Sequence, residues 1–123
     1  MDNQQGIINA NKDSQIMIGL PSKPPTELLN SLITLYSTIK EIKKAYNAHY
    51  FNPNTDTNAH TIIGIEATGN WDYILSASGS IVNNTIIPDP PVDFFQIKNN
   101  DNLSNHIKNQ FKPFYIKKLF GIF

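Results

Sequence analysis

A run of short polar residues around one proline, residues 52–58, most limits how this chain of 123 residues can fold. Residues 44–51 before it are rich in aromatic side chains, and residues 60–67 after it are rich in isoleucine. Aromatic and β-branched residues favour strands, whereas Asn, Asp and Pro favour turns. Two strands separated by such a turn form an antiparallel hairpin. The chain is therefore expected to contain a β-sheet with a long polar loop at one end.

A helix is predicted on the N-terminal side of this hairpin. Pro24 and Pro25 open it, because proline is tolerated in the first helical turn, where its missing N–H has no partner to lose. Apolar residues then recur every three or four positions up to about residue 40. They are Leu28, Leu29, Leu32, Ile33, Leu35, Tyr36 and Ile39.

Two further helices are predicted after the hairpin. Residues 71–82 show helical spacing from Trp71 onwards, although Gly79 weakens a helix by about 1 kcal/mol relative to alanine. Asp101 and Asn102 can cap a last helix over residues 103–111. Trp71 is expected to pack in the core, and the alternative is a binding hot spot, where tryptophan is enriched.

Apolar segments at residues 15–20 and 92–97 complete four predicted strands. The order β-α-β-β-α-β is typical of an α+β, ferredoxin-like βαββαβ two-layer sandwich, here followed by a C-terminal helix and tail. Its four strands would form an antiparallel sheet with two helices on one face. We expect an irregular N-terminal arm over residues 1–14 and a single domain over residues 15–123.

Both faces of this sheet are predicted to be apolar. Ile16 and Ile18 are expected to face the two helices, with Met17 on the other face. The second face needs cover, either from the terminal helix and tail or from a partner protein, which includes a second copy of the chain in a homodimer. The candidate interface residues are Met17, Tyr46, Tyr50, Phe94, Phe114, Tyr115 and Phe120.

Composition argues against several classes of protein. Ten lysines balance ten acidic residues, and arginine and cysteine are absent. Nucleic-acid binding draws on an excess of cationic side chains, so no nucleic-acid partner is expected. Without cysteine there is no disulfide, thiolate nucleophile or cysteine-bound zinc. No apolar run approaches 18 residues and the first 14 residues do not read as a signal peptide, so we expect a cytoplasmic protein without a membrane partner.

No motif predicts catalysis or a cofactor. The carboxylates are scattered, with Glu66 and Asp93 on strands, and neither a Gly-x-Ser-x-Gly elbow nor a phosphate-binding loop is present. His49, His60 and Asp56 could in principle hold zinc, but their spacing matches no zinc motif. They are read as ordinary residues of the hairpin, and no catalytic residue, metal or cofactor is expected.

Short motifs in a fixed order resemble a known family. They are Ile-Gly-Leu-Pro at residues 18–21, Pro-Pro at 24–25, Val-Asp-Phe at 92–94, Leu-Ser at 103–104 and Pro-Phe-Tyr at 113–115. In this spacing, over roughly residues 15–115, the chain resembles the C-terminal domain of the SseB family, named for enhanced serine sensitivity in bacteria. That family commonly carries an N-terminal domain before this one, and only residues 1–14 precede it here.

The resemblance implies a bacterial, cytoplasmic protein without catalytic residues to carry over. It favours a non-enzymatic protein-interaction or regulatory module. Two alternatives are a small-molecule or metal-binding domain, which rests on the ligands that ferredoxin-like folds often hold, and a toxin-neutralising immunity protein.

Overall fold

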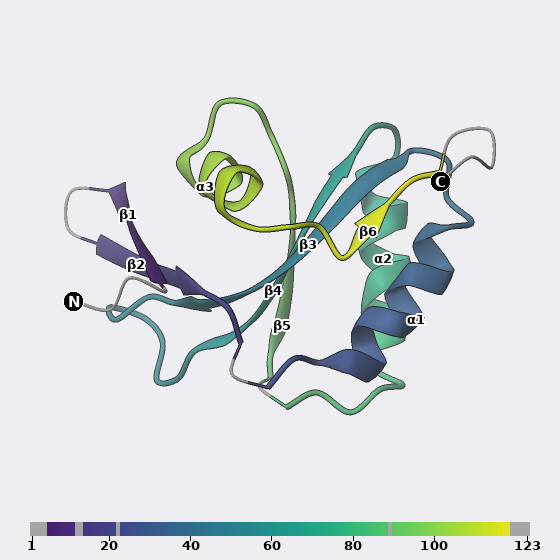
Figure 1. The fold of residues 1–123 in the computed structure, drawn as a ribbon. Coiled ribbons are helices and arrows are strands. Elements are labelled where there is room, and N and C mark those ends of the chain that lie inside the picture. The colour runs from purple at the N-terminus through teal and green to yellow at the C-terminus, as the bar shows by residue number, and fades with distance from the viewer. Residues whose placement is uncertain (1–4, 12–13, 22, 89, 119–123) are drawn as a thin grey trace.

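The computed structural model describes residues 5–11, 14–21, 23–88 and 90–118, which form a mixed α+β fold (Figure 1). A six-stranded sheet and three helices occupy these residues. In chain order they are β1 (Gln5–Asn11), β2 (Ser14–Gly19), α1 (Thr26–Tyr36), β3 (Ile42–Phe51), β4 (His60–Ala67), α2 (Trp71–Val82), β5 (Val92–Gln96), α3 (Asn102–Gln110) and β6 (Tyr115–Ile116). In this described part of the chain, no helix has the length and apolar character needed to span a bilayer.

The predicted hairpin is confirmed as β3 and β4. These strands are antiparallel along most of their length, from Ile42 opposite Ala67 to Tyr50 opposite His60. In the connecting loop, a carboxylate oxygen of Asp56 accepts a hydrogen bond of 2.8 Å from the backbone N–H of Asn52. Short polar side chains therefore satisfy the backbone of this turn, as their sequence predicts.

The strands lie in the order β1-β2-β3-β4-β5, and β6 pairs with β3. The ferredoxin-like arrangement is not confirmed, because β4 and β5 are adjacent and parallel instead of belonging to an antiparallel sheet. A crossover helix, here α2, allows two consecutive strands to be parallel neighbours. Local patterns fix where strands occur, but the choice of neighbour depends on how the helices pack.

Residues 5–11 form a regular strand, so the prediction of an irregular arm is wrong for this segment. Strand β1 pairs antiparallel with β2, with Ile8 opposite Ile16 and Gln5 opposite Gly19. The register shifts between Asn9 and Asn11. Backbone pairing with a neighbouring strand gives this polar sequence a strand structure that its side-chain pattern does not indicate.

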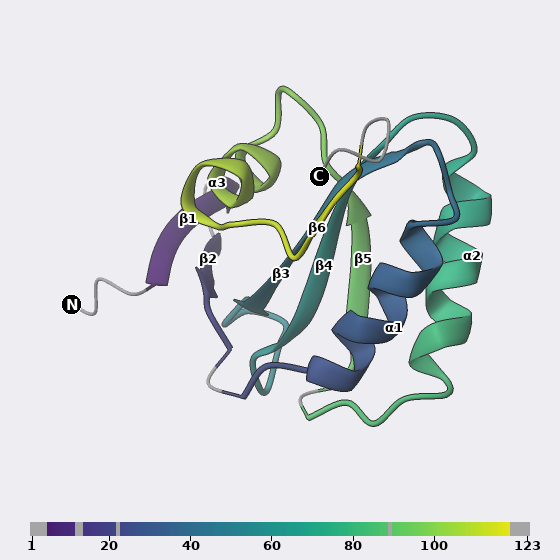
Figure 2. The same cartoon turned by 45° about the vertical axis from the view of Figure 1, so that its right-hand side comes forward.

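Helices cover both faces of the sheet (Figure 2). Helices α1 and α2 lie on one face, over a core that we call the α1–α2 core. Helix α3 lies on the other face, over a second core that we call the α3 core. Strand β4 supplies Ile63 and Ile65 to the first core and Ile62 to the second. The terminal helix therefore covers much of the second face, as one of the two expected lids.

Two residues of β2 face the opposite way from the prediction. Ile16 and Ile18 were expected against α1 and α2, but both are buried in the α3 core. Strand periodicity separates residues into two rows without showing which row faces which layer. The position of β2, at one end of β3 beside β1 and away from α1 and α2, decides the outcome here.

Polar contacts fix the ends of the helices. The side chain of Asn70 caps α2 by accepting from the N–H of Tyr73 at 3.1 Å. The predicted cap at Asp101 is confirmed, since its carboxylate accepts from the N–H of Ser104 at 2.7 Å. Inside the α1–α2 core, the hydroxyl of Tyr36 is 2.7 Å from that of Ser78. Burial raises the pKa of Tyr36, despite this hydrogen bond, so the phenol stays neutral.

Candidate functional site

Strand β5 forms one edge of the sheet. It pairs with β4 on one side, and no other described strand pairs with its second side. The N–H of Ile97, just after β5, donates to the carbonyl of Ile65 in β4 at 2.8 Å. Because alternate residues of a strand direct their backbone groups to opposite sides, those of Phe94 and Gln96 point away from β4. This edge therefore presents unused backbone donors and acceptors.

Two hollows flank Phe94 along this edge. The first has a volume of about 770 Å³ and is lined by residues that include Trp71, Phe94, Gln96, Lys98 and Leu103. The second has a volume of about 510 Å³ and is lined by residues that include Leu75, Gly79, Val82, Val92 and Phe94. We call the two hollows together the edge groove. Each has the volume of an ordinary ligand pocket.

The α2 side of the edge groove is apolar and partly open. Trp71 and Phe94 are half-buried against the α1–α2 core, and Leu75 is 39% exposed. Gly79 of α2 lines the second hollow, and a Cβ added there meets no atom within 4 Å. Apolar side chains that stay accessible beside empty space are a feature of binding surfaces.

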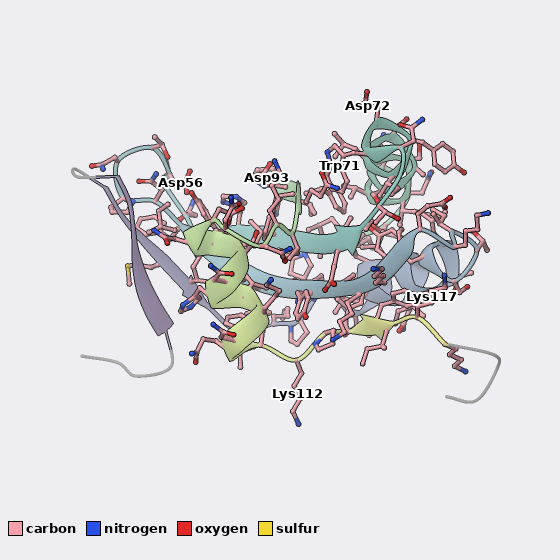
Figure 3. All side chains as sticks on the ribbon, turned by 90° about the horizontal axis from the view of Figure 1, so that it is seen from above. Asp56, Trp71, Asp72, Asp93, Lys112 and Lys117 are labelled. Atoms are coloured by element: carbon pink, nitrogen blue, oxygen red, sulfur yellow. The ribbon has the colours of Figure 1, made fainter. Side chains whose placement is uncertain are left out.

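Acidic side chains lie on the same side of the molecule. Figure 3 shows Asp56, Asp72 and Asp93 on the β5 side, together with Trp71. Asp72 follows Trp71 directly, and Asp93 precedes Phe94. Lys112 and Lys117 lie on the β6 side instead (Figure 3). The β5 side thus carries these three carboxylates, and Lys98 lines the first hollow on the same side.

A histidine holds one of these carboxylates in place. Nε2 of His60 is 2.7 Å from a carboxylate oxygen of Asp93, and Nδ1 of His60 is 3.9 Å from Asp56. The His60 side chain is only 7% exposed, whereas that of Asp93 is 64% exposed. The buried imidazole therefore links the β3–β4 loop to β5, and the carboxylate of Asp93 stays accessible.

Tyr50 packs against this histidine. The two ring centroids are 5.4 Å apart. Burial raises the pKa of Tyr50, a hydrogen bond with Asn52 opposes part of this increase, and the nearby charges of Asp56 and Asp93 add smaller increases. Tyr50 is thus a neutral phenol that shields one side of His60. Among the described residues, His49, His60 and Asp56 do not form a cluster of three metal ligands.

The candidate interface residues do not lie on one surface. Tyr46 is buried in the α3 core, and the half-buried Tyr50 packs against it. Tyr115 is buried in the α1–α2 core, and the half-buried Phe114 packs against that core.

The other three candidates are also separated. Phe94 is half-buried and lines the edge groove, whereas Met17 is half-buried in β2 and Phe120 lies outside the described residues. Only Phe94 among the seven is thus placed at the groove. The contribution of the others to an interface stays a prediction.

Sequence reasoning missed most residues of the edge groove. Leu75 and Gly79 belong to no motif, and the Leu-Ser motif at residues 103–104 does not indicate a groove. The proximity of these residues to Phe94 follows from the adjacent positions of β5 and the two helices. Phe94 was a candidate interface residue, and Trp71 gave a second signal, because a tryptophan at a helix start can be a core residue or a binding hot spot. In the structure it is half-buried, packs on the core and also lines the groove.

Comparison with known proteins places this chain in a family. The family model described as "SseB protein C-terminal domain" matches residues 10–117. Protein SseB of Escherichia coli (strain K12) and Protein SseB of Shigella flexneri are each 34% identical to the chain over 101 residues, which cover 81% of the chain. The chain spans only 39% of the length of these relatives, and no solved structure gives a significant match. The chain belongs to the SseB family, through the C-terminal domain of that family.

Proposed function

We propose that this domain is a non-enzymatic, cytoplasmic protein-interaction module and that its partner binds in the edge groove. The observation that carries the proposal is a strand edge that pairs with no other strand of the described residues and lies directly beside accessible apolar side chains. Backbone groups at such an edge supply hydrogen bonds, and partly exposed Trp71 and Phe94 supply an apolar anchor.

The chemistry of the described residues supports binding over catalysis. His60, the most buried imidazole of the hairpin region, is engaged by Asp93 and packed against Tyr50. The edge groove itself is lined mainly by apolar and amide side chains, with Lys98 and Asp101 at one end. Such a lining favours recognition of a surface over activation of a nucleophile.

The test blocks the edge groove without damaging the core. Gly79→Leu places a side chain into the second hollow, where a Cβ meets no atom within 4 Å. Leucine is also a better helix former than glycine, so the variant is expected to fold at least as stably. Asn30→Leu is the matched control, because it adds the same side chain to an exposed position of α1.

Affinity capture from bacterial lysate with the three proteins, followed by calorimetry on the purified partner, gives the readout. We expect wild type and Asn30→Leu to bind the same partner with equal affinity. Gly79→Leu should bind it at least about tenfold more weakly, a change of about 1.4 kcal/mol. Equal binding by all three proteins would refute the assignment of the edge groove.

A further inference from the structure

The chemistry of the edge groove also indicates what kind of partner fits it. Resting on the proposed function, we infer that the partner inserts an extended, basic segment that pairs with β5 as an additional strand. The apolar side chains of that segment would point toward α2, and its cationic side chains would point toward Asp93.

The backbone of β5 is suited to strand addition. Natural sheets protect exposed edges with lysines, prolines, bulges or very short strands. Residues 92–96 contain neither lysine nor proline, and β5 pairs with β4 without a break in register. At the β6 side, by contrast, the edge strand is only two residues long. Strand β5 is therefore the less protected of these two edges and the better template for an added strand.

The side-chain environment differs between the two faces of such an added strand. Phe94 packs toward the α1–α2 core and lines both hollows, of which the second is also lined by Val92 and the first reaches round to Leu103 on the α3 side. Residues two apart in a strand share a face and are separated by roughly 7 Å. Two apolar side chains of the partner could therefore enter the two hollows and straddle Phe94.

The opposite face carries the acidic group. Phe95 packs against the α3 core, and Asp93 belongs to the same row of β5 because strand side chains alternate. Asp93 is held at 2.7 Å by His60 yet remains 64% exposed, so it is oriented before any partner arrives. A lysine or arginine of the added strand that lies opposite Asp93 could form an ion pair with this fixed carboxylate.

Charge selects a basic partner over a second copy of this chain. Pairing of β5 with β5 of another copy would bring the acidic side chains at Asp72 and Asp93 of both copies into one interface. Like charges within a Debye length of about 8 Å repel each other at physiological ionic strength. Within the groove Lys98 and Asp101 line the same hollow, so the accessible carboxylate of Asp93, which lies on β5 itself, is the charge that an added strand would meet.

Synthetic peptides test the inference directly. Fluorescence anisotropy would compare a seven-residue peptide that alternates lysine and valine with one that alternates glutamate and valine. A third peptide repeats the lysine–valine sequence with N-methyl groups on alternate amides, which removes the hydrogen bonds of an added strand. We expect the lysine–valine peptide to bind at least about tenfold more tightly than either of the other two.

Protein variants locate the binding site of the peptide. Gly79→Leu should abolish binding, and Asp93→Asn should weaken it severalfold and reduce its dependence on salt. Glu27→Gln is the matched control for charge, because Glu27 is exposed in the first turn of α1, and it should leave binding unchanged. Amide resonances of Phe94 and Gln96 should shift on binding.

Each contrary result has a defined meaning. If Gly79→Leu loses the natural partner but wild type binds none of the peptides, the partner does not add an extended strand to β5. The proposed function would still stand. Equal binding of the acidic peptide would overturn the charge argument. A wild-type dimer in sedimentation that Gly79→Leu dissociates would overturn the basic segment in favour of a second copy.

Discussion

The two sides of the central strands β3, β4 and β5 are treated differently. On the β3 side, β2 pairs with one end of β3 and β6 pairs with the other end. On the β5 side, no described strand adds to the sheet. Strand β6 extends the sheet beside β3 and carries Tyr115, which is buried in the α1–α2 core. The β5 edge thus differs from the β3 edge, because the core on that side is complete without a further described strand.

Several contacts hold the β6 side together. The N–H of Phe114 donates to the carbonyl of Ala45 at 2.8 Å, and the N–H of Lys117 donates to that of Lys43 at 2.8 Å. The hydroxyl of Tyr115 donates to the carbonyl of Tyr36 at 3.2 Å, and the rings of these two tyrosines pack edge to face. The side-chain ammonium of Lys117 donates to the carbonyl of Lys40. This closure is therefore part of the folded core.

The largest expected effect comes from breaking this closure. Replacing Phe114 and Tyr115 together by alanine removes two aromatic side chains from the α1–α2 core. Loss of a buried aromatic side chain costs about 3–5 kcal/mol, so we expect the free energy of unfolding to fall by at least that amount. Urea unfolding followed by circular dichroism measures the change.

The neighbouring residue of β6 supplies the control for this experiment. Ile116 is 56% exposed, and Ile116→Ala should change the free energy of unfolding by only about 0.5 kcal/mol. An unchanged urea midpoint in the double variant would show that β6 is not part of the cooperative fold.

A smaller effect is expected where β5 rests on β4. Gly64 lies opposite Phe95, and a Cβ at Gly64 would come within 2.7 Å of Cζ of Phe95 and 2.9 Å of Cδ1 of Ile97. Gly64→Ala should therefore displace side chains of the α3 core and lower the free energy of unfolding by about 1–3 kcal/mol. Thermal and urea unfolding would measure the loss.

Gly79 gives the contrasting substitution beside the open edge. Because a Cβ there meets no atom within 4 Å, Gly79→Ala should raise the free energy of unfolding by about 0.5–1 kcal/mol. Similar destabilisation by both substitutions would mean that the groove beside α2 is not open space.

Sequence patterns predicted where the helices and strands lie in the chain better than they predicted which of these elements pack or pair with one another. The hairpin, the three helices and the cap at Asp101 follow from spacing and local chemistry, because these features depend on residues close in sequence. The strand order, the pairing of residues 5–11 and the facing of Ile16 depend on which segments meet in space. The edge groove belongs to this second group. Trp71 and Phe94 line one hollow because β5 lies at the edge beside the start of α2, a relation that neither residue indicates alone.

The smallest effect concerns α3, which leads into the closed side. His106 of α3 packs against Phe111, with ring centroids 6.2 Å apart, and burial lowers the pKa of His106 below its ordinary value of 6.5. The unfolded chain therefore binds a proton more readily than the folded one as the pH falls through about 6.5. Stability that is fully present above this pH should decrease toward pH 5.5. His106→Gln should lose less stability over that interval than wild type, as measured by urea midpoints at pH 7.5, 6.5 and 5.5.

This pH experiment is a comparison of differences, because the two proteins share every other side chain and only the contribution of His106 differs between them. Parallel curves for wild type and His106→Gln would contradict the burial of His106 against Phe111. A separation that grows as the pH falls would place the acid-sensitive contact between His106 of α3 and Phe111 at the end of that helix. The packing of α3 on the second face of the sheet would then weaken in mild acid, because the α3 core includes Phe111, the ring that His106 contacts.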